Sequence, residues 1–419
     1  MLMTELASEG PAGAGAAPSR SGGLDSFVAA IAVGQVVSWG VLYYAFSVLL
    51  VPMQRQLGWP RPVLVGGFTV AVVISGLLAT TVGRRLDHGS SRLVMGAGSA
   101  FAVVVVVAWS QARSVPVYYL AWAGIGVAMA LVLYEPAFTV IAKRYAPHHH
   151  RPLTAVTLIA GTASFVFQPL TSTLASAYGW RIALVLLAAI LAAITLPIHL
   201  RLLPHAPAGR PQPPDPAVAR HVTDRRFWNL TAAFTCASVT SFGTSVLLVA
   251  YLIDHGWTLG GAAMAGGMLG IMQLPGRLLF APLHARLDRR TLTRLTLGLP
   301  GFGVVLLLLS GGKPLVWAAI PVLGMTQGLN TLLRVTLLVD LYGTARFGAL
   351  NGRSASPVVL ARALAPLGAA SLGSATGGYA VPFALLAAVA GLAGYLGGNA
   401  LMPEIVDGRN LRPVDLTDV

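Results

Sequence analysis

The sequence predicts an all-α polytopic membrane protein, with twelve transmembrane helices in two pseudo-symmetric six-helix bundles. Only 10% of the 419 residues are charged, whereas soluble globular domains carry roughly 25%. The mean hydropathy is +0.73. Apolar runs of about 20 residues, each long enough to cross a ~30 Å hydrocarbon core, recur between Phe27 and Met402. Because backbone groups find no water inside a bilayer, each run must form a helix.

The apolar runs also give the position of each helix. In chain order they cover residues 27–50, 62–83, 93–112, 117–142, 153–176, 181–201, 227–253, 262–283, 295–311, 315–341, 354–374 and 381–402. The prolines of LPHAPAGRPQPPDPAVAR, residues 203–220, prevent a helix and favour an extended linker. We therefore expect a disordered cytoplasmic tail at residues 1–26, an N-terminal bundle at 27–201 and a cytoplasmic linker at 202–226. A C-terminal bundle at 227–402 and a cytoplasmic tail at 403–419 follow.

Basic residues are distributed unevenly between the two sides of the membrane. With the N-terminus in the cytoplasm, the outer side carries only Arg55, Arg61, Arg113, Arg181 and Lys313, and the cytoplasmic turns carry most of the other arginines and lysines. This is the distribution of the positive-inside rule. It predicts a multi-pass protein of the cell inner membrane with both termini cytoplasmic. The net charge of +14 thus has an explanation that needs no nucleic acid.

The two halves of the chain resemble each other in sequence. Five short matches occur in the same order at an offset of roughly 200 residues: SWG with SFG, LGW with HGW, RLD with RLD, QPL with APL, and SAYGWR with SATGGY. A duplicated six-helix unit explains this order. Parallel repeats of that kind place a binding site near the membrane midplane between the halves, with access that alternates as the halves rock.

Arg277 is the first candidate functional residue. It lies inside the run GGMLGIMQLPGRLLFAPL, residues 266–283, where Gln273 is the only other polar side chain. An arginine at the centre of a transmembrane helix costs roughly 2.5–3.5 kcal/mol on insertion scales, so such residues usually face a cavity and serve a substrate or ion pathway. The alternative is a structural arginine that extends its head group toward the interface.

The expected loop GRRLDHGSSR, residues 83–92, resembles the signature of the major facilitator superfamily between helices two and three. Gly83, Asp87 and Arg92 stand at the matching positions, Arg85 lies between them, and Asp288 ends the repeated RLD of the second half. The resemblance implies a loop that braces the two helices and tunes the opening of the cytoplasmic side. Gly83 permits a tight turn, and Asp87 near Arg92 suits an ion pair. The alternative is a loop whose charges only satisfy topology.

Two longer stretches resemble the monocarboxylate porter and oxalate/formate antiporter branch of that superfamily. They are SWGVLYYAFSVLLVPMQRQLGW, residues 38–59, and GRRLDHGSSRLVMGAGS, residues 83–99. The resemblance implies that an arginine of helix eight and a basic residue of helix eleven bind a carboxylate, and Arg277 and Arg362 occupy these positions. Gln273 stands where the monocarboxylate porters have an aspartate, and helix one lacks their lysine. Proton coupling through that aspartate is therefore not expected.

Two guanidinium groups in a low-dielectric cavity favour a planar anion, because each presents a fork of donors that matches a carboxylate and neither gives up its proton. Glu135 and Arg334 add two charges at near-equivalent points of the repeat. They form either a proton relay, with Glu135 taking the proton because burial raises a carboxyl pKa, or a static pair. Trp39 and Tyr43 share a helix face. This face either lines the cavity together with Gln273 or packs against neighbouring helices.

These observations predict a secondary transporter that moves a small organic anion, coupled to protons or to a counter-anion, and that functions as a monomer. A drug-efflux transporter and a transporter-like sensor are the alternatives. No catalytic residue, cofactor or metal site is expected, since phosphate-cradling, HExxH and nucleophile-elbow motifs are missing from the sequence. The tract His148–His150 is expected to be a solvated turn, because its ligands do not converge from different elements.

Overall fold

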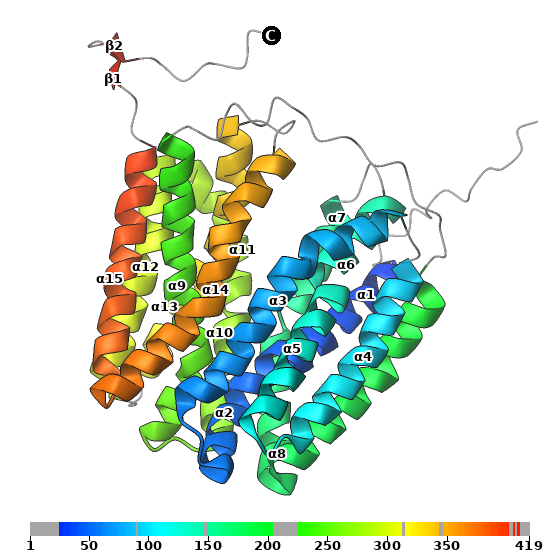
Figure 1. Ribbon diagram of the computed structural model, residues 1–419. Helices are drawn as coiled ribbons and strands as arrows, with labels where there is room; N and C mark the ends of the chain where they lie inside the picture. The colour runs from blue at the N-terminus through cyan, green and yellow to red at the C-terminus, as the bar shows by residue number, and fades with distance from the viewer. Residues whose placement is uncertain are drawn as a thin grey trace, which may run out of the picture.

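The structure is a computed structural model in which two helical bundles stand side by side (Figure 1). It describes residues 25–88, 91–145, 150–203, 225–311, 315–342, 347–401, 405–406 and 409–410. Most of the expected tails and linker lie outside the described residues. A short antiparallel pair, β1 (Ile405–Val406) and β2 (Arg409–Asn410), follows the second bundle.

The N-terminal bundle runs from Ser26 to Leu202. Its elements are α1 (Ser26–Trp39), the π-helical turn η1 (Gly40–Tyr44), α2 (Ala45–Leu57), α3 (Arg61–His88), α4 (Ser91–Gln111), α5 (Val115–Val132), α6 (Tyr134–Arg144), α7 (His150–Ala160), α8 (Ala163–Pro197) and the π-helical turn η2 (Ile198–Leu202).

The C-terminal bundle runs from Arg225 to Ala400. Its elements are α9 (Arg225–Asp254), α10 (Leu259–Ile271), α11 (Gln273–Arg286), α12 (Arg289–Ser310), α13 (Val316–Tyr342), α14 (Phe347–Thr376) and α15 (Ala380–Ala400).

The helices of the described residues account for the twelve predicted membrane passes. Ten helical stretches are long and apolar enough to span a bilayer. One of them, residues 152–202, turns back on itself at Gly179, whose φ of 79° ends one helix and starts the next. The halves of another pass, α10 and α11, have 13 and 14 residues, and together they reach the ~20 residues that a bilayer requires. The all-α polytopic fold is thus confirmed.

Three passes are interrupted near the middle of their length, and the break between α5 and α6 has a clear chemical cause. Pro136 has no backbone N–H, so the carbonyl of Val132, four residues earlier, loses its helical donor. The side chain of Gln35 on α1 replaces that donor, with Nε2 2.7 Å from the Val132 oxygen. Similar breaks separate α7 from α8 and α10 from α11. Such irregular backbone is tolerated in a membrane where protein surrounds it or where it lines a cavity.

The structure corrects the predicted turn at Gly83. Helix α3 continues through Gly83 to His88, because Val82 and Leu86 extend its apolar face and pack with Ala130 of α5. Only residues 89 and 90 separate α3 from α4 in the expected loop, and these two lie outside the described residues. Arg85 is exposed and Arg92 is half-buried in the first turn of α4. The side chain of Asp87 lies outside the described residues.

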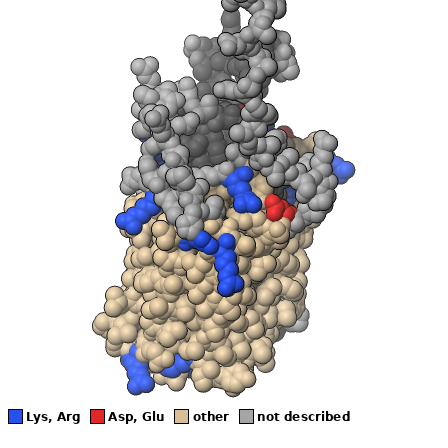
Figure 2. Space-filling model, turned by 90° about the vertical axis from the view of Figure 1, so that its right-hand side faces the viewer, with Lys and Arg blue, Asp and Glu red and all other residues tan. Residues whose placement is uncertain are grey.

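The two ends of the molecule differ in how closely the bundles approach. We call the end with Leu202 and Arg225 the linker end, and the end with Arg61 and Asp254 the far end. The bundles converge at the far end and diverge toward the linker end (Figure 1). Figure 2 shows a broad band without charged side chains between the arginines of the two ends, as expected for a surface that faces lipid.

Candidate functional site

A cavity of about 400 Å³ lies between the two bundles. It is lined by residues of both bundles, including α6, which follows the break after α5, and the interrupted α7–α8 and α10–α11 pairs. All six side chains that the sequence suggests for substrate binding line this one cavity: Trp39, Tyr43, Gln273, Arg277, Arg334 and Arg362. The fold therefore brings together residues that are more than 300 positions apart in the sequence.

Arg277 projects from α11 across the cavity to the opposite bundle. Its Nη1 donates a hydrogen bond to the carbonyl of Thr157, at 3.2 Å. Thr157 belongs to the last turn of α7, which ends at Ala160, and the carbonyl end of a helix carries partial negative charge that favours a cation. Arg277 is thus held at a helix end, and its guanidinium remains part of the cavity wall.

Arg334 of α13 and Arg362 of α14 add two further guanidinium groups to the same wall. The Arg362 guanidinium lies over the Phe242 ring at 4.9 Å from the ring centroid, and Nη2 of Arg334 donates to Ser354 Oγ at 2.9 Å. None of the described residues that line the cavity is an aspartate or a glutamate. The cavity is therefore a concentration of positive charge in a low-dielectric setting.

Gln273 occupies the first turn of α11, one turn before Arg277. Its Nε2 donates to Oε1 of Gln327 on α13, at 2.8 Å. Both amides line the cavity. A neutral amide pair thus stands beside Arg277, and it offers hydrogen bonds to a ligand without adding a charge.

Aromatic side chains of the N-terminal bundle form much of the rest of the cavity wall. The ring centroid of Trp39 lies 5.3 Å from that of Tyr43 and 4.9 Å from that of Tyr134. Tyr134 stacks on Phe138, with ring centroids 5.0 Å apart. Tyr43 and Tyr44 are adjacent in sequence, yet both line the cavity. They lie in the π-helical turn η1, a feature that often marks functional sites.

The pairing expected between Glu135 and Arg334 is not formed in this conformation. Glu135 is exposed in the first turn of α6, immediately after the break at Leu133. Neither ion pair recorded between described residues involves it; these pairs are Arg61 with Asp254 and Arg289 with Asp340. The helix break explains the difference, because it turns Glu135 out of the α5 helical register.

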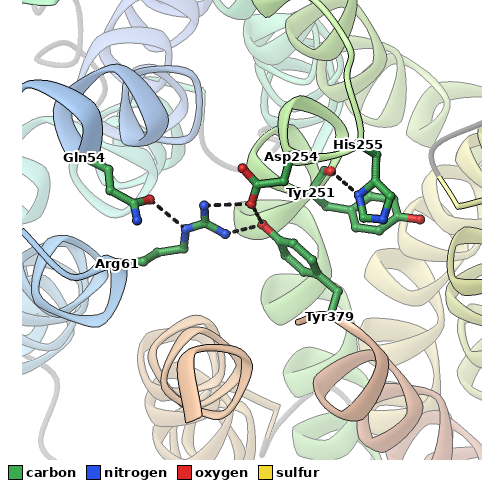
Figure 3. A network of polar contacts seen from close by, with 6 residues as sticks. All are labelled: Gln54, Arg61, Tyr251, Asp254, His255 and Tyr379. Carbon is green, nitrogen blue, oxygen red and sulfur yellow. Dashed lines mark hydrogen bonds and ion pairs between the residues drawn. The ribbon is translucent and has the colours of Figure 1, made fainter. Parts of the chain in front are cut away.

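A polar network joins the two bundles at the far end (Figure 3). Arg61, at the start of α3, pairs with Asp254, at the end of α9, with Nη2 2.8 Å from Oδ2. Tyr379, which precedes α15, donates to the same oxygen at 2.7 Å and is also hydrogen-bonded by Arg61. Gln54 accepts from Nε of Arg61 at 3.1 Å. Sequence reasoning missed this network, because it treated Arg61 only as a topology charge.

At the linker end, Asp288 caps a helix. Its Oδ2 accepts a hydrogen bond from the backbone N–H of Thr291 at 2.9 Å, at the start of α12. Hydrogen bonding by Thr291 holds the pKa of Asp288 below its ordinary value. The carboxylate therefore stabilises a helix start, a role that its place in the repeated RLD alone does not show.

Among the described residues, no group of three or more His, Cys, Asp or Glu side chains could hold a metal ion. His148 and His149 lie outside the described residues, and His150 begins α7.

Comparisons with known proteins agree with this architecture. Monocarboxylate transporter 13 of Rattus norvegicus is 25% identical over 327 residues, which cover 76% of this chain and 74% of that protein. A bacterial homologue of the human lysosomal transporter Spinster, solved inward-facing and unoccupied, has a TM-score of 0.72 at 13% identity, over 90% of this chain and 98% of that one. The nucleoside transporter NupG has a TM-score of 0.76 at 12% identity, and the match covers 90% of this chain and 99% of that one.

The sequence profile of the Major Facilitator Superfamily matches residues 31–352. This match covers most of both bundles and includes the interrupted passes that surround the cavity. The resemblance that the short motifs indicated is confirmed, and the protein belongs to the Major Facilitator Superfamily of membrane transporters.

Proposed function

We propose that the protein moves a small organic anion with a carboxylate group across the cell inner membrane by alternating access, with both termini in the cytoplasm. The observation that carries this proposal is the charge of the cavity: three guanidinium groups line it, and none of its described lining residues is acidic. An anion relieves the repulsion among these cations, whereas a cation adds to it. The likeness to a monocarboxylate transporter supports the same substrate class.

The arrangement of the bundles supports the alternating-access part of the proposal. The hydrogen bonds between the bundles, as far as the chain is described, lie at the far end or near the middle. They join Arg61 to Asp254 and Tyr379, Thr69 to Ala363, and Arg277 to Thr157. The bundles diverge toward the linker end (Figure 1). We infer that this conformation is closed on the outer side and admits substrate from the cytoplasmic side.

Uptake of a labelled carboxylate into proteoliposomes tests the function. We expect Arg277→Gln and Arg362→Gln each to lower transport by at least 100-fold, because each leaves a carboxylate without its charged partner. The matched control is Arg286→Gln, on the same helix as Arg277 but exposed and outside the cavity, which should transport normally. Transport of amphipathic cations that survives both cavity substitutions would support drug efflux instead.

We propose that coupling runs either to a counter-anion or to protons, with Glu135 as the proton-coupling residue. Glu135 follows Tyr134, which lines the cavity, so a change in its protonation acts close to the site. If protons are coupled through it, Glu135→Gln removes the pH dependence of uptake but leaves exchange of labelled for unlabelled substrate. A pH profile identical to that of the wild type excludes this role and favours anion exchange.

A further inference from the structure

The cavity is chemically asymmetric between the two bundles. Every arginine in its wall belongs to the C-terminal bundle. The N-terminal bundle contributes most of the aromatic rings instead, and these are Trp39, Tyr43, Tyr44, Phe46, Phe68, Tyr134 and Phe138. Arg277 nevertheless reaches across to Thr157 of the N-terminal bundle, so a ligand at the arginines also lies beside the aromatic rings, and a charged group joined to a flat apolar body can contact both.

The aromatic wall is packed as a continuous surface. The Trp39 ring lies within 5.3 Å of Tyr43 and 4.9 Å of Tyr134, in tilted geometry. Tyr43 in turn packs edge-on against Phe68, at 5.0 Å. Aromatic rings prefer offset or edge-to-face neighbours, and Trp39, Tyr43 and Tyr134 are only half-buried, so part of each side chain is open to one more ring.

A hydrogen-bond donor in this wall lacks an acceptor within the protein. The indole Nε1 of Trp39 is buried, and no described residue accepts its hydrogen bond. Buried polar groups in folded proteins are nearly always paired. Because this atom has almost no accessible surface, Trp39 presents its ring and not its N–H to a ligand in the cavity.

The cavity is also larger than a short acid requires. Its 400 Å³ corresponds to the liquid volume of about 13 water molecules at ~30 Å³ each. A three-carbon acid, with about six non-hydrogen atoms, fills less than half of that space on the same scale. A carboxylate on a six-membered ring has about nine non-hydrogen atoms and fills more of that space on the same scale.

We propose that the substrate is an aromatic monocarboxylate, whose carboxylate binds Arg277 and Arg362 and whose ring packs on Trp39 and Tyr134. This inference rests on the proposed transport of organic anions and narrows its substrate class. Such a ligand contacts both bundles at once, so its binding links them. A short aliphatic acid at the arginines leaves the aromatic wall uncovered.

Competition for transport in proteoliposomes tests the inference with matched probes. Benzoate is compared with cyclohexanecarboxylate, which has similar size but no aromatic ring, with propionate, which is short, and with benzamide, which has the ring but no charge. We expect benzoate to inhibit at concentrations at least tenfold below those of the other carboxylates, and benzamide not to inhibit. Trp39→Leu should reduce the preference for benzoate over cyclohexanecarboxylate at least fivefold, and the exposed Trp317→Leu should leave it unchanged.

The outcomes separate the two proposals. If Arg277-dependent transport occurs but propionate and cyclohexanecarboxylate compete as well as benzoate, the aromatic substrate class is wrong and carboxylate transport stands. If no carboxylate is transported or competes, both fail. Should Trp39→Leu not fold, Trp39→Phe retains a ring without the N–H. Trp39→Phe should keep the preference for benzoate over cyclohexanecarboxylate; equal loss of affinity for all carboxylates contradicts the proposal.

Discussion

Arg277 makes two kinds of contact in the structure. It lines the cavity, and it donates to the Thr157 carbonyl of the other bundle. A carboxylate is a stronger acceptor than a backbone carbonyl, because charge-assisted hydrogen bonds are roughly twice as strong as neutral ones. If the proposed carboxylate binds Arg277, it competes with this contact between the bundles, and occupancy of the site then affects how the bundles move.

Replacement of Arg277 by lysine separates charge from geometry. Arg277→Lys keeps the positive charge but lacks the planar fork that binds a carboxylate through two hydrogen bonds. A lost hydrogen bond to a charged group is worth about 1.5–3 kcal/mol, so kcat/KM should fall by roughly 10- to 100-fold. Initial rates of uptake over a range of substrate concentrations measure this. A variant with wild-type kcat/KM would show that only charge matters at this position.

The residues of the site were predictable to different degrees. Arg277, Arg334 and Arg362 stand out because charges inside apolar runs must face protein or a cavity. The contribution of Tyr44 was not predictable, since α-helical spacing places Trp39 and Tyr43 on one face and turns Tyr44 away. The π-helical turn at Gly40–Tyr44 changes that register and brings both tyrosines to the cavity. Composition and periodicity carry no signal of such a turn.

At the scale of single elements, hydropathy predicts that a pass exists but not where it breaks. The apolar runs located all twelve passes, because length and polarity alone decide whether a helix spans a bilayer. The break at Leu133 depends on Pro136 and on Gln35 from another helix, which supplies the donor that Val132 has lost. A contact between segments about 100 residues apart is not visible in a local pattern.

The hydrogen bond from Gln35 therefore supports the break in the fourth pass. Gln35→Leu leaves the buried Val132 carbonyl without a donor, which costs about 1–3 kcal/mol for a buried polar group. We expect a matching loss in the free energy of unfolding, measured in detergent with a chemical denaturant. Gln111→Leu, at the exposed end of α4, is the control. Equal stability of both variants would mean that water or backbone adjustment satisfies Val132.

Close packing of α11 against α13 positions Arg277. A Cβ on Gly328 of α13 would lie 2.1 Å from the backbone oxygen of Gln273, one turn before Arg277. Gly328→Ala therefore forces the start of α11 to move, and overpacking of this kind costs roughly 1–3 kcal/mol. We expect lower thermal stability and reduced affinity for the carboxylate. Gly391→Ala, where the added Cβ meets nothing within 4 Å, should change neither; normal affinity in Gly328→Ala would show that α11 does not set the Arg277 position.

At the scale of the whole molecule, the far-end network is the feature that could not be predicted from the sequence. Charges at helix ends satisfy topology in any membrane protein, so Arg61 and Asp254 do not stand out, and their pairing depends on how the bundles meet. The network draws on α3, α9 and the start of α15. It lies where the bundles converge (Figure 1). Its disruption should therefore favour the conformation that opens at the far end.

Asp254→Asn tests this role of the network. The Arg61 and Asp254 side chains are 15% and 36% exposed, so the pair is partly screened and contributes on the order of 1 kcal/mol. That energy corresponds to about a fivefold change in a two-state equilibrium. The experiment uses a background protein with Ser241→Cys in the cavity wall and Cys236→Ser to remove the native thiol. An impermeant thiol reagent applied at the far end should label this background about fivefold faster when it also carries Asp254→Asn. Arg55→Gln, an exposed charge at the same end, should label at the starting rate. Equal labelling of all three proteins would show that the network does not hold the far end closed.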